Sequence, residues 1–473
     1  MTQQSQLSEN YSGIDLEPGP RMSERYKNYI VGICTAAYVL SFVDRQALSL
    51  MIEPIKRDLS LTDTQFSLLS GLAFSVLYSV MGLPIAALAD RRSRPVIISI
   101  GIALWSLATA LSGLSKGFAH MFLARVGVGV GEASLTPSAY SMFSDMFPKS
   151  RLGRAAGIYS LGSFIGGSAA FFIGGYVIGL LKDVDTVAVP LVGDVRAWQL
   201  TFFIIGLPGL LVALVFLLTV RDPVRRGLAR DSAGAVRKVA MRDVFTFLRS
   251  HTRTFLCHYA GFSCYAMVLL GLMAWVPAFY MRAFGLSPTE VGYVLGGVVL
   301  LANGSGVLFG GWLVDRLTKL GHPDGAMRAG VIGAVGMLVP VIVFPHVRPL
   351  WLSLVLLAVT MFFASFPMPA STAAMQVLSP NQMRAQVSAV FLLISNLSAV
   401  GLGTTLVALV TDELLGSSRR IGTSLSLVYG VASVGSIVLL WRGCAHFRKS
   451  LAHEERIAAE ARDVAVQESG AAG

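Results

Sequence analysis

Residues 86–94 read Ala-Ala-Leu-Ala-Asp-Arg-Arg-Ser-Arg, and residues 311–316 read Gly-Trp-Leu-Val-Asp-Arg. Each stretch ends a long apolar segment with an Asp-Arg pair, and each Asp lies four residues after a small residue, Ala86 or Gly311. Each pair also closes the second apolar segment of its half of the chain. Matching junctions at matching positions are typical of membrane proteins built from two parallel repeats. The two stretches therefore predict a duplicated membrane protein.

The composition of the 473 residues supports this prediction. The chain is 54% hydrophobic and 14% charged, whereas soluble domains carry about 25% charged residues. Runs of about 20 apolar residues recur, each long enough to cross a bilayer as a helix. They predict an all-α integral membrane fold with twelve transmembrane helices in two pseudo-symmetric halves of six. The expected spans are 28–52, 66–89, 95–114, 119–146, 152–181, 198–220, 255–282, 289–314, 326–345, 350–377, 384–412 and 421–446.

The distribution of Lys and Arg predicts the orientation of these helices. If both tails are cytoplasmic, Lys and Arg favour the cytoplasmic side by about three to one, as the positive-inside rule requires. We therefore expect a multi-pass membrane protein with both termini in the cytoplasm. The net charge of +11 would suit a nucleic acid, but the basic residues lie in short loops, mostly on one side of the predicted membrane, so we expect no nucleic-acid partner. The expected order is a cytoplasmic N-terminal tail (1–27, without the apolar core of a signal peptide), a six-helix half (28–220), a basic cytoplasmic linker (221–254), a second six-helix half (255–446) and a cytoplasmic C-terminal tail (447–473).

Four charges interrupt two of the apolar segments. Asp44 and Arg45 lie in the first span, and Arg125 and Glu132 lie in the fourth. A charge at bilayer depth costs roughly 3 kcal/mol or more, so it persists where it is paired or lines an aqueous cavity. Arg125 and Glu132 are two helical turns apart and share a face, whereas Asp44 and Arg45 diverge by about 100°. We expect the two helices to share a cavity, with Asp44 beside Arg125 and Arg45 beside Glu132, although the opposite pairing also fits.

These residue types suggest proton-coupled binding of an anion. A carboxylate that moves between dry and wet settings changes its proton affinity, which makes Glu132 and Asp44 candidates for proton coupling. An Arg that is freed by this protonation suits phosphate or carboxylate, which makes Arg125 and Arg45 candidates for anion binding. The alternative is a static ion network that fixes helix packing.

The second half carries no acidic residue at mid-membrane and therefore suits the apolar part of an amphipathic substrate. Its candidate cavity wall comprises His258, Tyr259, Tyr265, Asn303, Gln376 and Asn396, each of which could instead be a packing residue. Glycines such as Gly127 with Gly131, and Gly162 with Gly166, predict close helix contacts. The four cysteines have no metal-ligand spacing and fit apolar packing. No catalytic constellation or Walker loop is present, so we expect no cofactor, no metal and no enzymatic activity.

The junctions and the twelve-helix plan resemble the major facilitator superfamily, whose loop signature is Gly, three residues, Asp-Arg, any residue, Gly-Arg. Ala86 and Ser93 replace the two glycines of the signature. The resemblance implies a charge latch between the halves that steadies an outward-open state. Its members would be Asp90, Arg91, Arg94, Asp315 and Arg316. The alternative is that the two aspartates only cap helix ends.

Three stretches narrow the resemblance: Ser-Phe-Val-Asp-Arg-Gln (41–46), Ala-Arg-Val-Gly-Val-Gly-Val-Gly-Glu-Ala-Ser (124–134) and the segment 137–148. They are similar to the Spinster family, in a bacterial form, which implies a location in the inner membrane of a bacterium. This similarity implies proton-linked export of lysolipids or sphingoid phosphates by alternating access, with the four buried charges at functional positions. One alternative is the organic anion:proton symporter branch, and another is a receptor that keeps the carrier fold without transport. Because one chain supplies both halves, we expect a monomer in the lipid bilayer.

Overall fold

Side-chain caps fix where three of the long helical regions begin. In the computed structural model, which describes residues 22–89, 91–181, 186–189, 193–225, 241–379 and 383–471, Ser23 accepts a hydrogen bond from the backbone N–H of Tyr26. Reciprocal capping boxes join Thr62 to Gln65 and join Ser287 to Glu290. Each cap satisfies backbone N–H groups that a helix start leaves without an intrahelical partner.

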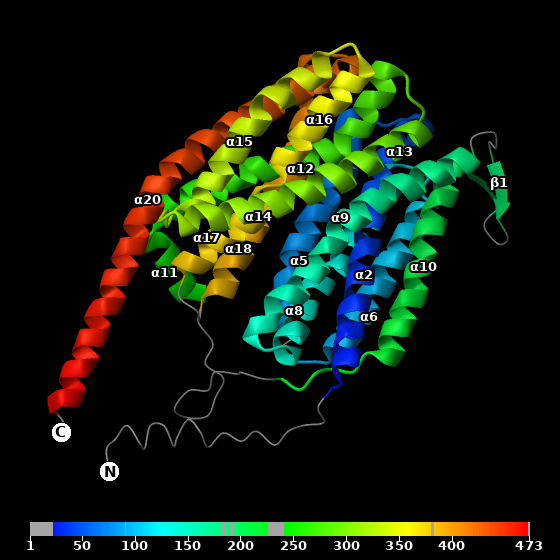
Figure 1. The fold of residues 1–473 in the computed structure, drawn as a ribbon. Helices are drawn as coiled ribbons and strands as arrows, with labels where there is room; N and C mark the ends of the chain where they lie inside the picture. Colours follow the sequence, from blue (N-terminus) through cyan, green and yellow to red (C-terminus); the bar gives the residue numbers. More distant parts are fainter. Residues whose placement is uncertain are drawn as a thin grey trace.

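The helices before residue 225 form one group in space, which we call the N-terminal group (Figure 1). It consists of α2 (Glu24–Leu50), α3 (Ile52–Leu59), α4 (Asp63–Ser67), the π-helical turn η1 (Leu68–Leu72), α5 (Ala73–Ala89), α6 (Arg94–Ser112), α7 (Phe118–Glu132), α8 (Leu135–Met146), α9 (Lys149–Leu180), the strands β1 (Thr186–Val189) and β2 (Gly193–Arg196), and α10 (Ala197–Thr219).

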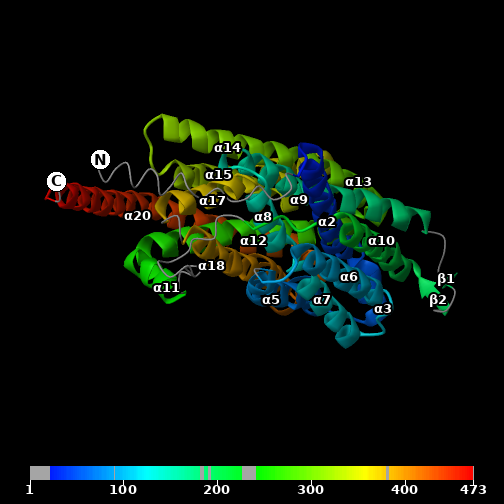
Figure 2. The same ribbon diagram turned by 90° about the horizontal axis from the view of Figure 1, so that it is seen from below.

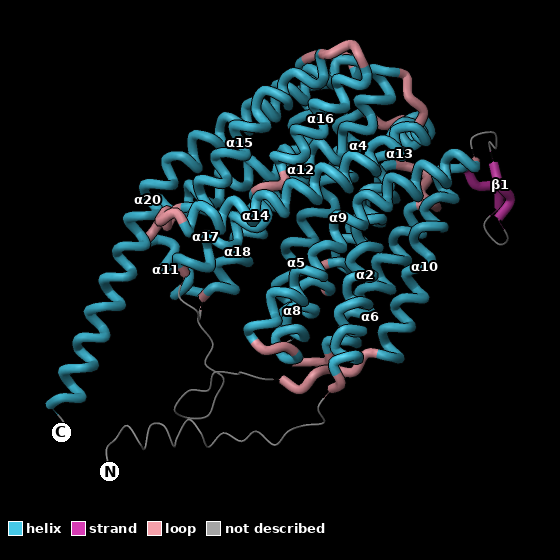
Figure 3. The backbone as a smooth tube through the Cα atoms, in the orientation of Figure 1, coloured by secondary structure: helices cyan, strands magenta, loops and turns pink. Residues whose placement is uncertain are grey.

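The helices after residue 241 form the C-terminal group (Figures 1 and 3). It consists of α11 (Met241–Ser250), α12 (Thr252–Phe284), α13 (Pro288–Val298), η2 (Val299–Asn303), α14 (Gly304–Lys319), α15 (Gly325–Val343), η3 (Phe344–His346), α16 (Leu350–Ala364), α17 (Pro367–Leu378), α18 (Arg384–Asn396), η4 (Leu397–Gly403), α19 (Thr404–Leu409), η5 (Val410–Leu414), η6 (Ser418–Arg420) and α20 (Ile421–Ala471).

Nine helices of the described part of the chain are long and apolar enough to cross a membrane, so the protein is a multi-pass membrane protein. Three predicted spans do not reach that standard for physical reasons. α2 carries Asp44 and Arg45, α7 ends before α8 at Ala133–Ser134, and α16 ends before α17 at Ser365–Phe366. The count of twelve therefore remains a prediction.

A two-stranded antiparallel hairpin joins α9 to α10, which differs from the all-α prediction. Thr186 pairs with Arg196 and Val189 pairs with Gly193. The first strand reads Thr-Val-Ala-Val, and β-branched residues favour strands. Arg196 pairs with Asp58 of α3, and Trp198 donates a hydrogen bond of 2.7 Å to the same carboxylate. The hairpin is therefore anchored to helix α3.

The apolar core is continuous between the groups only toward one end of the bundle. One cluster of buried residues joins Met51, Phe66 and Leu69 of the N-terminal group to Trp275 and Phe279 of α12. A second cluster contains residues of the N-terminal group alone. The ribbons of the two groups diverge toward the end where α2 begins (Figure 1). We call that end the proximal side, and we call the end that carries Asp63 and Arg282 the distal side.

Candidate functional site

The four buried charges of α2 and α7 lie together in the N-terminal group. Asp44, Arg125 and Glu132 are almost fully buried, with 2%, 1% and 2% of their surface exposed. Arg45 donates a hydrogen bond of 2.6 Å from Nε to Oε2 of Glu132, and its Nη2 also pairs with that oxygen. Arg45 with Glu132 is one of the two pairs expected from the sequence.

Aromatic rings surround the Arg45 guanidinium. Its central carbon lies 4.9 Å from the ring centre of Phe42, 4.4 Å from that of Phe74 and 4.9 Å from that of Tyr78. Cations are attracted to aromatic faces within about 6 Å. The Arg45 side chain keeps 18% of its surface exposed, so it is less buried than the other three charges of the cluster.

The second expected pair is not formed. Asp44 instead accepts a hydrogen bond of 3.2 Å at Oδ2 from the hydroxyl of Thr109 on α6, and its Oδ1 has no hydrogen-bond partner in the described structure. Nε and Nη1 of Arg125 are also buried without a partner among the described residues, as is Oε1 of Glu132. Asp44 thus bonds to α6, and no ion pair joins it to Arg125 among the described residues. The cluster thus has polar capacity that the protein itself leaves unused.

Close helix packing holds these charges in place. A Cβ added to Gly131 of α7 would lie 2.7 Å from the carbonyl oxygen of Gly101 and 2.7 Å from the nitrogen of Trp105, both on α6. A Cβ added to Gly166 of α9 would lie 2.5 Å from the carbonyl oxygen of Val39 on α2. The predicted packing role of these glycines is confirmed. α7 and α2 are therefore fixed against their neighbours by contacts that larger residues would prevent.

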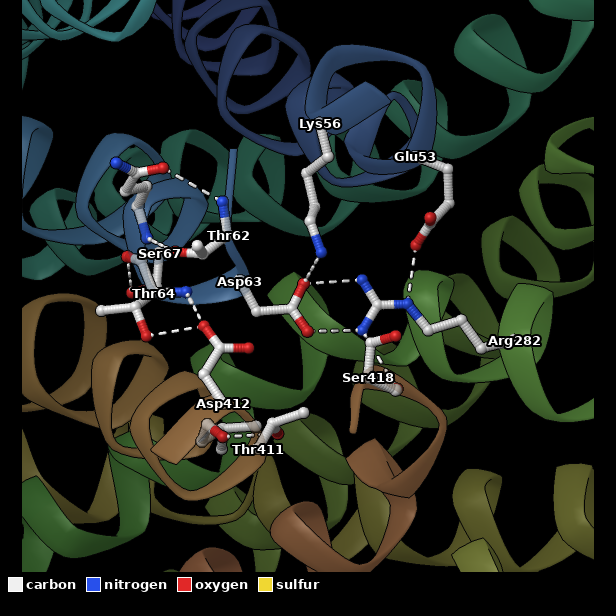
Figure 4. A network of polar contacts seen from close by, with 12 residues as sticks. Glu53, Lys56, Thr62, Asp63, Thr64, Ser67, Arg282, Thr411, Asp412 and Ser418 are labelled. Atoms are coloured by element: carbon white, nitrogen blue, oxygen red, sulfur yellow. Dashed lines mark hydrogen bonds and ion pairs between the residues drawn. The ribbon is translucent and has the colours of Figure 1, made fainter. Parts of the chain in front are cut away.

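A second polar network, not predicted from the sequence, ties the two groups together on the distal side (Figure 4). Arg282 of α12 donates hydrogen bonds of 2.7 Å from Nη1 and Nη2 to the two carboxylate oxygens of Asp63, and one of 2.7 Å from Nε to Glu53. Lys56 also pairs with Asp63. Such bidentate, charge-assisted contacts are among the stronger polar interactions in proteins.

The same network extends to the eleventh predicted span. Asp412 of η5 accepts hydrogen bonds of 2.7 and 2.8 Å from the backbone nitrogen and the hydroxyl of Thr64. Gly71 of η1 approaches the same region so closely that an added Cβ would lie 2.4 Å from the carbonyl oxygen of Val400. Polar bonds and backbone contact together close the distal side between the groups.

The residues predicted for the latch form no ion pair between the two groups within the described structure. Asp90 lies outside the described residues. Arg91, Asp315 and Arg316 are exposed, and none of them forms an ion pair within the described structure. Arg94 is fully buried and pairs with Asp145 and with Asp222, at 2.7 Å from its Nε to Oδ1 of Asp222. Arg94 therefore joins parts of the N-terminal group, and the latch in an outward-open state stays a prediction.

The predicted cavity-wall residues mostly bond to backbone. Nε2 of His258 lies 2.9 Å from the carbonyl oxygen of Ser371, and the hydroxyl of Tyr259 donates a bond of 2.9 Å to that of Val387. Tyr265 donates to the carbonyl oxygen of Phe363, and Asn396 donates to the carbonyl oxygen of Leu392 in its own helix. Oδ1 of Asn303 is buried without a partner among the described residues. The side chain of Gln376 lies outside the described part.

Comparison with known proteins shows that this chain is similar to membrane transporters. The chain aligns over 456 residues, 95% of its length, with the whole of an MFS-type efflux pump of Mycolicibacterium smegmatis at 27% identity. It is 27% identical over 60% of its length to a probable L-galactonate transporter of Escherichia coli, of which the match spans 61%. The crystal structure of a bacterial homologue of the human lysosomal transporter Spinster, inward-facing and unoccupied, superposes with a TM-score of 0.75 at 26% identity, covering 91% of this chain and 98% of that one.

The profile that describes the Major Facilitator Superfamily matches residues 34–404, a range that contains most of the N-terminal group, the C-terminal group as far as Thr404, and all four buried charges. The sequence resemblance to that superfamily, and to a bacterial Spinster homologue within it, is confirmed by these matches. On this evidence the chain belongs to the Major Facilitator Superfamily of membrane transporters.

Proposed function

We propose that the protein is a proton-coupled secondary transporter that exports an amphipathic anion, such as a lysolipid or a sphingoid phosphate, by alternating access. The observation that carries the proposal is the buried cluster of Asp44, Arg45, Arg125 and Glu132, in which two nitrogens of Arg125 have no hydrogen-bond partner among the described residues. A charge buried in a membrane helix is costly unless it is compensated. A buried guanidinium with unused hydrogen-bond donors is suited to binding and releasing an anionic ligand.

The coupling of proton to anion follows from the ion pair between Glu132 and Arg45. Glu132 holds Arg45, and Oε1 of Glu132 is free of hydrogen bonds within the described structure. A proton on Glu132 removes the negative partner of Arg45, whose guanidinium is then available to an anion together with Arg125. Loss of the proton restores the ion pair and expels the anion. Asp44, whose Oδ1 has no hydrogen-bond partner in the described part of the chain, is the second candidate carrier of the proton.

Alternating access is supported by the uneven contact between the groups. The distal network joins them through Arg282 and Asp63, whereas Arg94 pairs within the N-terminal group on the proximal side. A carrier closed on one side and separated on the other matches one of the two states that alternating access requires. If the positive-inside orientation holds, the proximal side is cytoplasmic and the membrane is the bacterial inner membrane.

A two-fold repeat with twelve spans is supported by the spacing of the second helix in each group. Thr62 caps the first of these helices 28 residues before Asp90, and Ser287 caps the second 28 residues before Asp315. Both helices also contain a π-helical turn, η1 or η2. We infer halves at 28–220 and 255–446, joined by the linker 221–254, in a protein that works as a monomer without enzymatic activity.

The aromatic surroundings of Arg45 favour an amphipathic substrate. Phe42, Phe74 and Tyr78 offer apolar surface directly beside the cation, as a lipid with an anionic head requires. The alternative is an organic anion:proton symporter. It is favoured by the similarity to the probable L-galactonate transporter, because Arg45 and Arg125 also suit a small carboxylate. A receptor without transport would bind the ligand and leave the four charges unused for flux.

Flux in proteoliposomes under an imposed pH gradient tests the proposal. A labelled lysophospholipid and a labelled hexonate are compared in the wild type, in Glu132→Gln and in the exposed control Glu413→Gln. We expect gradient-dependent movement of the lysophospholipid that is lost in Glu132→Gln and kept in the control. Movement of the hexonate alone would establish the symporter, and binding of both ligands without flux would establish the receptor. Unchanged pH dependence in Glu132→Gln would remove this residue from the coupling step.

A further inference from the structure

We propose that a cavity on the proximal side of the C-terminal group binds an anionic phospholipid of the adjacent leaflet through its phosphate. The cavity has a volume of about 800 Å³ and lies between α14, α15 and α20. Its lining combines Arg328, Arg442, Arg448 and His446 with Leu317, Val331, Ile332, Trp441, Cys444 and Ala445. This volume falls in the range of small-molecule sites, roughly 300–1,000 Å³.

The height of the cavity along α20 matches the headgroup layer of a bilayer. α20 begins at Ile421, directly after the distal segment η6. Trp441 lies 20 residues further along the helix, a rise of about 30 Å, which is the thickness of the hydrocarbon core. Trp441 is 70% exposed, and Trp is enriched where the hydrocarbon meets the headgroups. Figures 1 and 2 show α15 beside α20 along this stretch.

The charges of the cavity leave positive capacity for a phosphate. Arg328 and Arg448 share one buried carboxylate, that of Asp324, with Nε of Arg328 at 3.0 Å from Oδ1. Arg442 forms no ion pair with any described residue, and His446 adds a further nitrogen donor or acceptor. Arg328 and Arg448 share a single negative charge, and Arg442 adds a positive charge that no described carboxylate neutralises, so the site is cationic. Guanidinium forks suit phosphate oxygens.

The apolar part of the lining selects a lipid over a soluble anion. Val331 and Ile332 of α15 and Trp441 of α20 give the cavity an apolar wall, in which Ile332 is 44% and Trp441 is 70% exposed. A phosphate at Arg442 would place its acyl chains along these side chains. Basic pockets between membrane helices at this level hold phospholipid headgroups in the same manner. The site is separate from the Arg45–Glu132 cluster and does not depend on the proposed substrate.

Titration of the purified protein in phosphatidylcholine nanodiscs with fluorescent phosphatidylglycerol tests this assignment. Arg442→Gln removes the guanidinium that forms no ion pair with the described residues. It should weaken binding about fivefold or more, since a basic residue near a membrane surface contributes about 1 kcal/mol. The matched control Arg419→Gln makes the same charge change at an exposed distal position. It should bind like the wild type. Thermal unfolding of each variant confirms that the fold is kept.

Two further measurements distinguish a phospholipid headgroup from a soluble phosphate as the ligand. A fluorescent phosphatidylcholine should bind more weakly than phosphatidylglycerol, and glycerol 3-phosphate at millimolar concentration should not displace the bound lipid. Equal binding by Arg442→Gln and the control would overturn the proposal. Displacement by glycerol 3-phosphate would also overturn it, because the site would then take a soluble phosphate.

Discussion

Arg282 on α12 holds Asp63 on α4 with two parallel hydrogen bonds of 2.7 Å, and this contact joins the C-terminal group to the N-terminal group. The Asp63 side chain is fully buried and that of Arg282 is 8% exposed. Solvent therefore screens this ion pair weakly. Because the pair spans the two groups on the distal side, it can exist only while that side is closed.

Asp63→Asn should shift the protein toward states that are open on the distal side. The substitution leaves the Arg282 guanidinium buried with reduced compensation, which costs about 2–5 kcal/mol in comparable charge pairs. Spin labels at the exposed positions 57 and 413, one in each group, report the separation. The four free cysteines must first be replaced. We expect a longer distance population in the variant.

Glu53→Gln is the matched control for this prediction. Glu53 also bonds to Arg282, but its side chain is 41% exposed, so its loss should change the distance distribution much less. Identical distributions in Asp63→Asn and the wild type would mean that the pair does not hold the distal side closed.

Gly131→Ala should destabilise the N-terminal group. The new Cβ would lie 2.7 Å from the Gly101 carbonyl oxygen and the Trp105 nitrogen, and such overpacking costs about 1–3 kcal/mol. Gly32→Ala of α2 is the control, because a Cβ at Gly32 would meet no atom of the described residues within 4 Å. The midpoint of thermal unfolding in detergent should fall for Gly131→Ala and hold or rise for Gly32→Ala. Equal midpoints would show that α6 and α7 can separate at little cost.

The anchor of the β1–β2 hairpin should be insensitive to pH near neutrality. Burial alone would raise the pKa of Asp58, but hydrogen bonds from Arg196 and Trp198 outweigh it and hold that pKa below its ordinary value. A lowered carboxylate pKa contributes stability above the unfolded value, about 3.9, which is lost as the pH falls through the folded value. Hydrogen exchange in β1 and β2 should show constant protection between about pH 8 and 5.

Asp58→Asn should raise the same exchange severalfold at pH 7, because the asparagine cannot pair with Arg196 as a charge. Exposed Asp194→Asn on β2 serves as the control. Protection that stayed unchanged in Asp58→Asn would mean that the strands hold their position without α3.

The buried charges could be named from the sequence because they interrupt apolar runs, where any charge is unusual. Their pairing could be predicted only in part. Helical geometry separates Asp44 from Arg45 by about 100°, which restricts them to different neighbours but does not say which. The hydroxyl of Thr109, an ordinary residue in an apolar helix, decides the orientation of Asp44.

The distal network could not be predicted from the sequence, because its members stand where charged residues are common. Glu53 and Lys56 lie between the first two predicted spans, and Arg282 ends the seventh. Charges are expected at such places and carry little information. Their proximity depends on how the two groups meet, and that contact changes with the conformational state. The one usable signal was the pair of capping sequences, Thr62 to Gln65 and Ser287 to Glu290, which mark equivalent helix starts in the two groups.

Arg125→Gln should weaken binding of an anionic substrate about tenfold or more, with a smaller effect on folding. Nε and Nη1 of Arg125 have no hydrogen-bond partners in the described structure, so few protein contacts are lost. Removal of the guanidinium takes away a charge-assisted contact that is worth roughly 1.5–3 kcal/mol. Arg125→Lys keeps the charge without the planar fork and should recover stability more fully than binding. Equilibrium binding of the labelled lysophospholipid, measured beside thermal unfolding, separates the two effects. If Arg125→Gln lost stability and kept its affinity, Arg125 would belong to a static ion network, and anion recognition would have to rest on Arg45 alone.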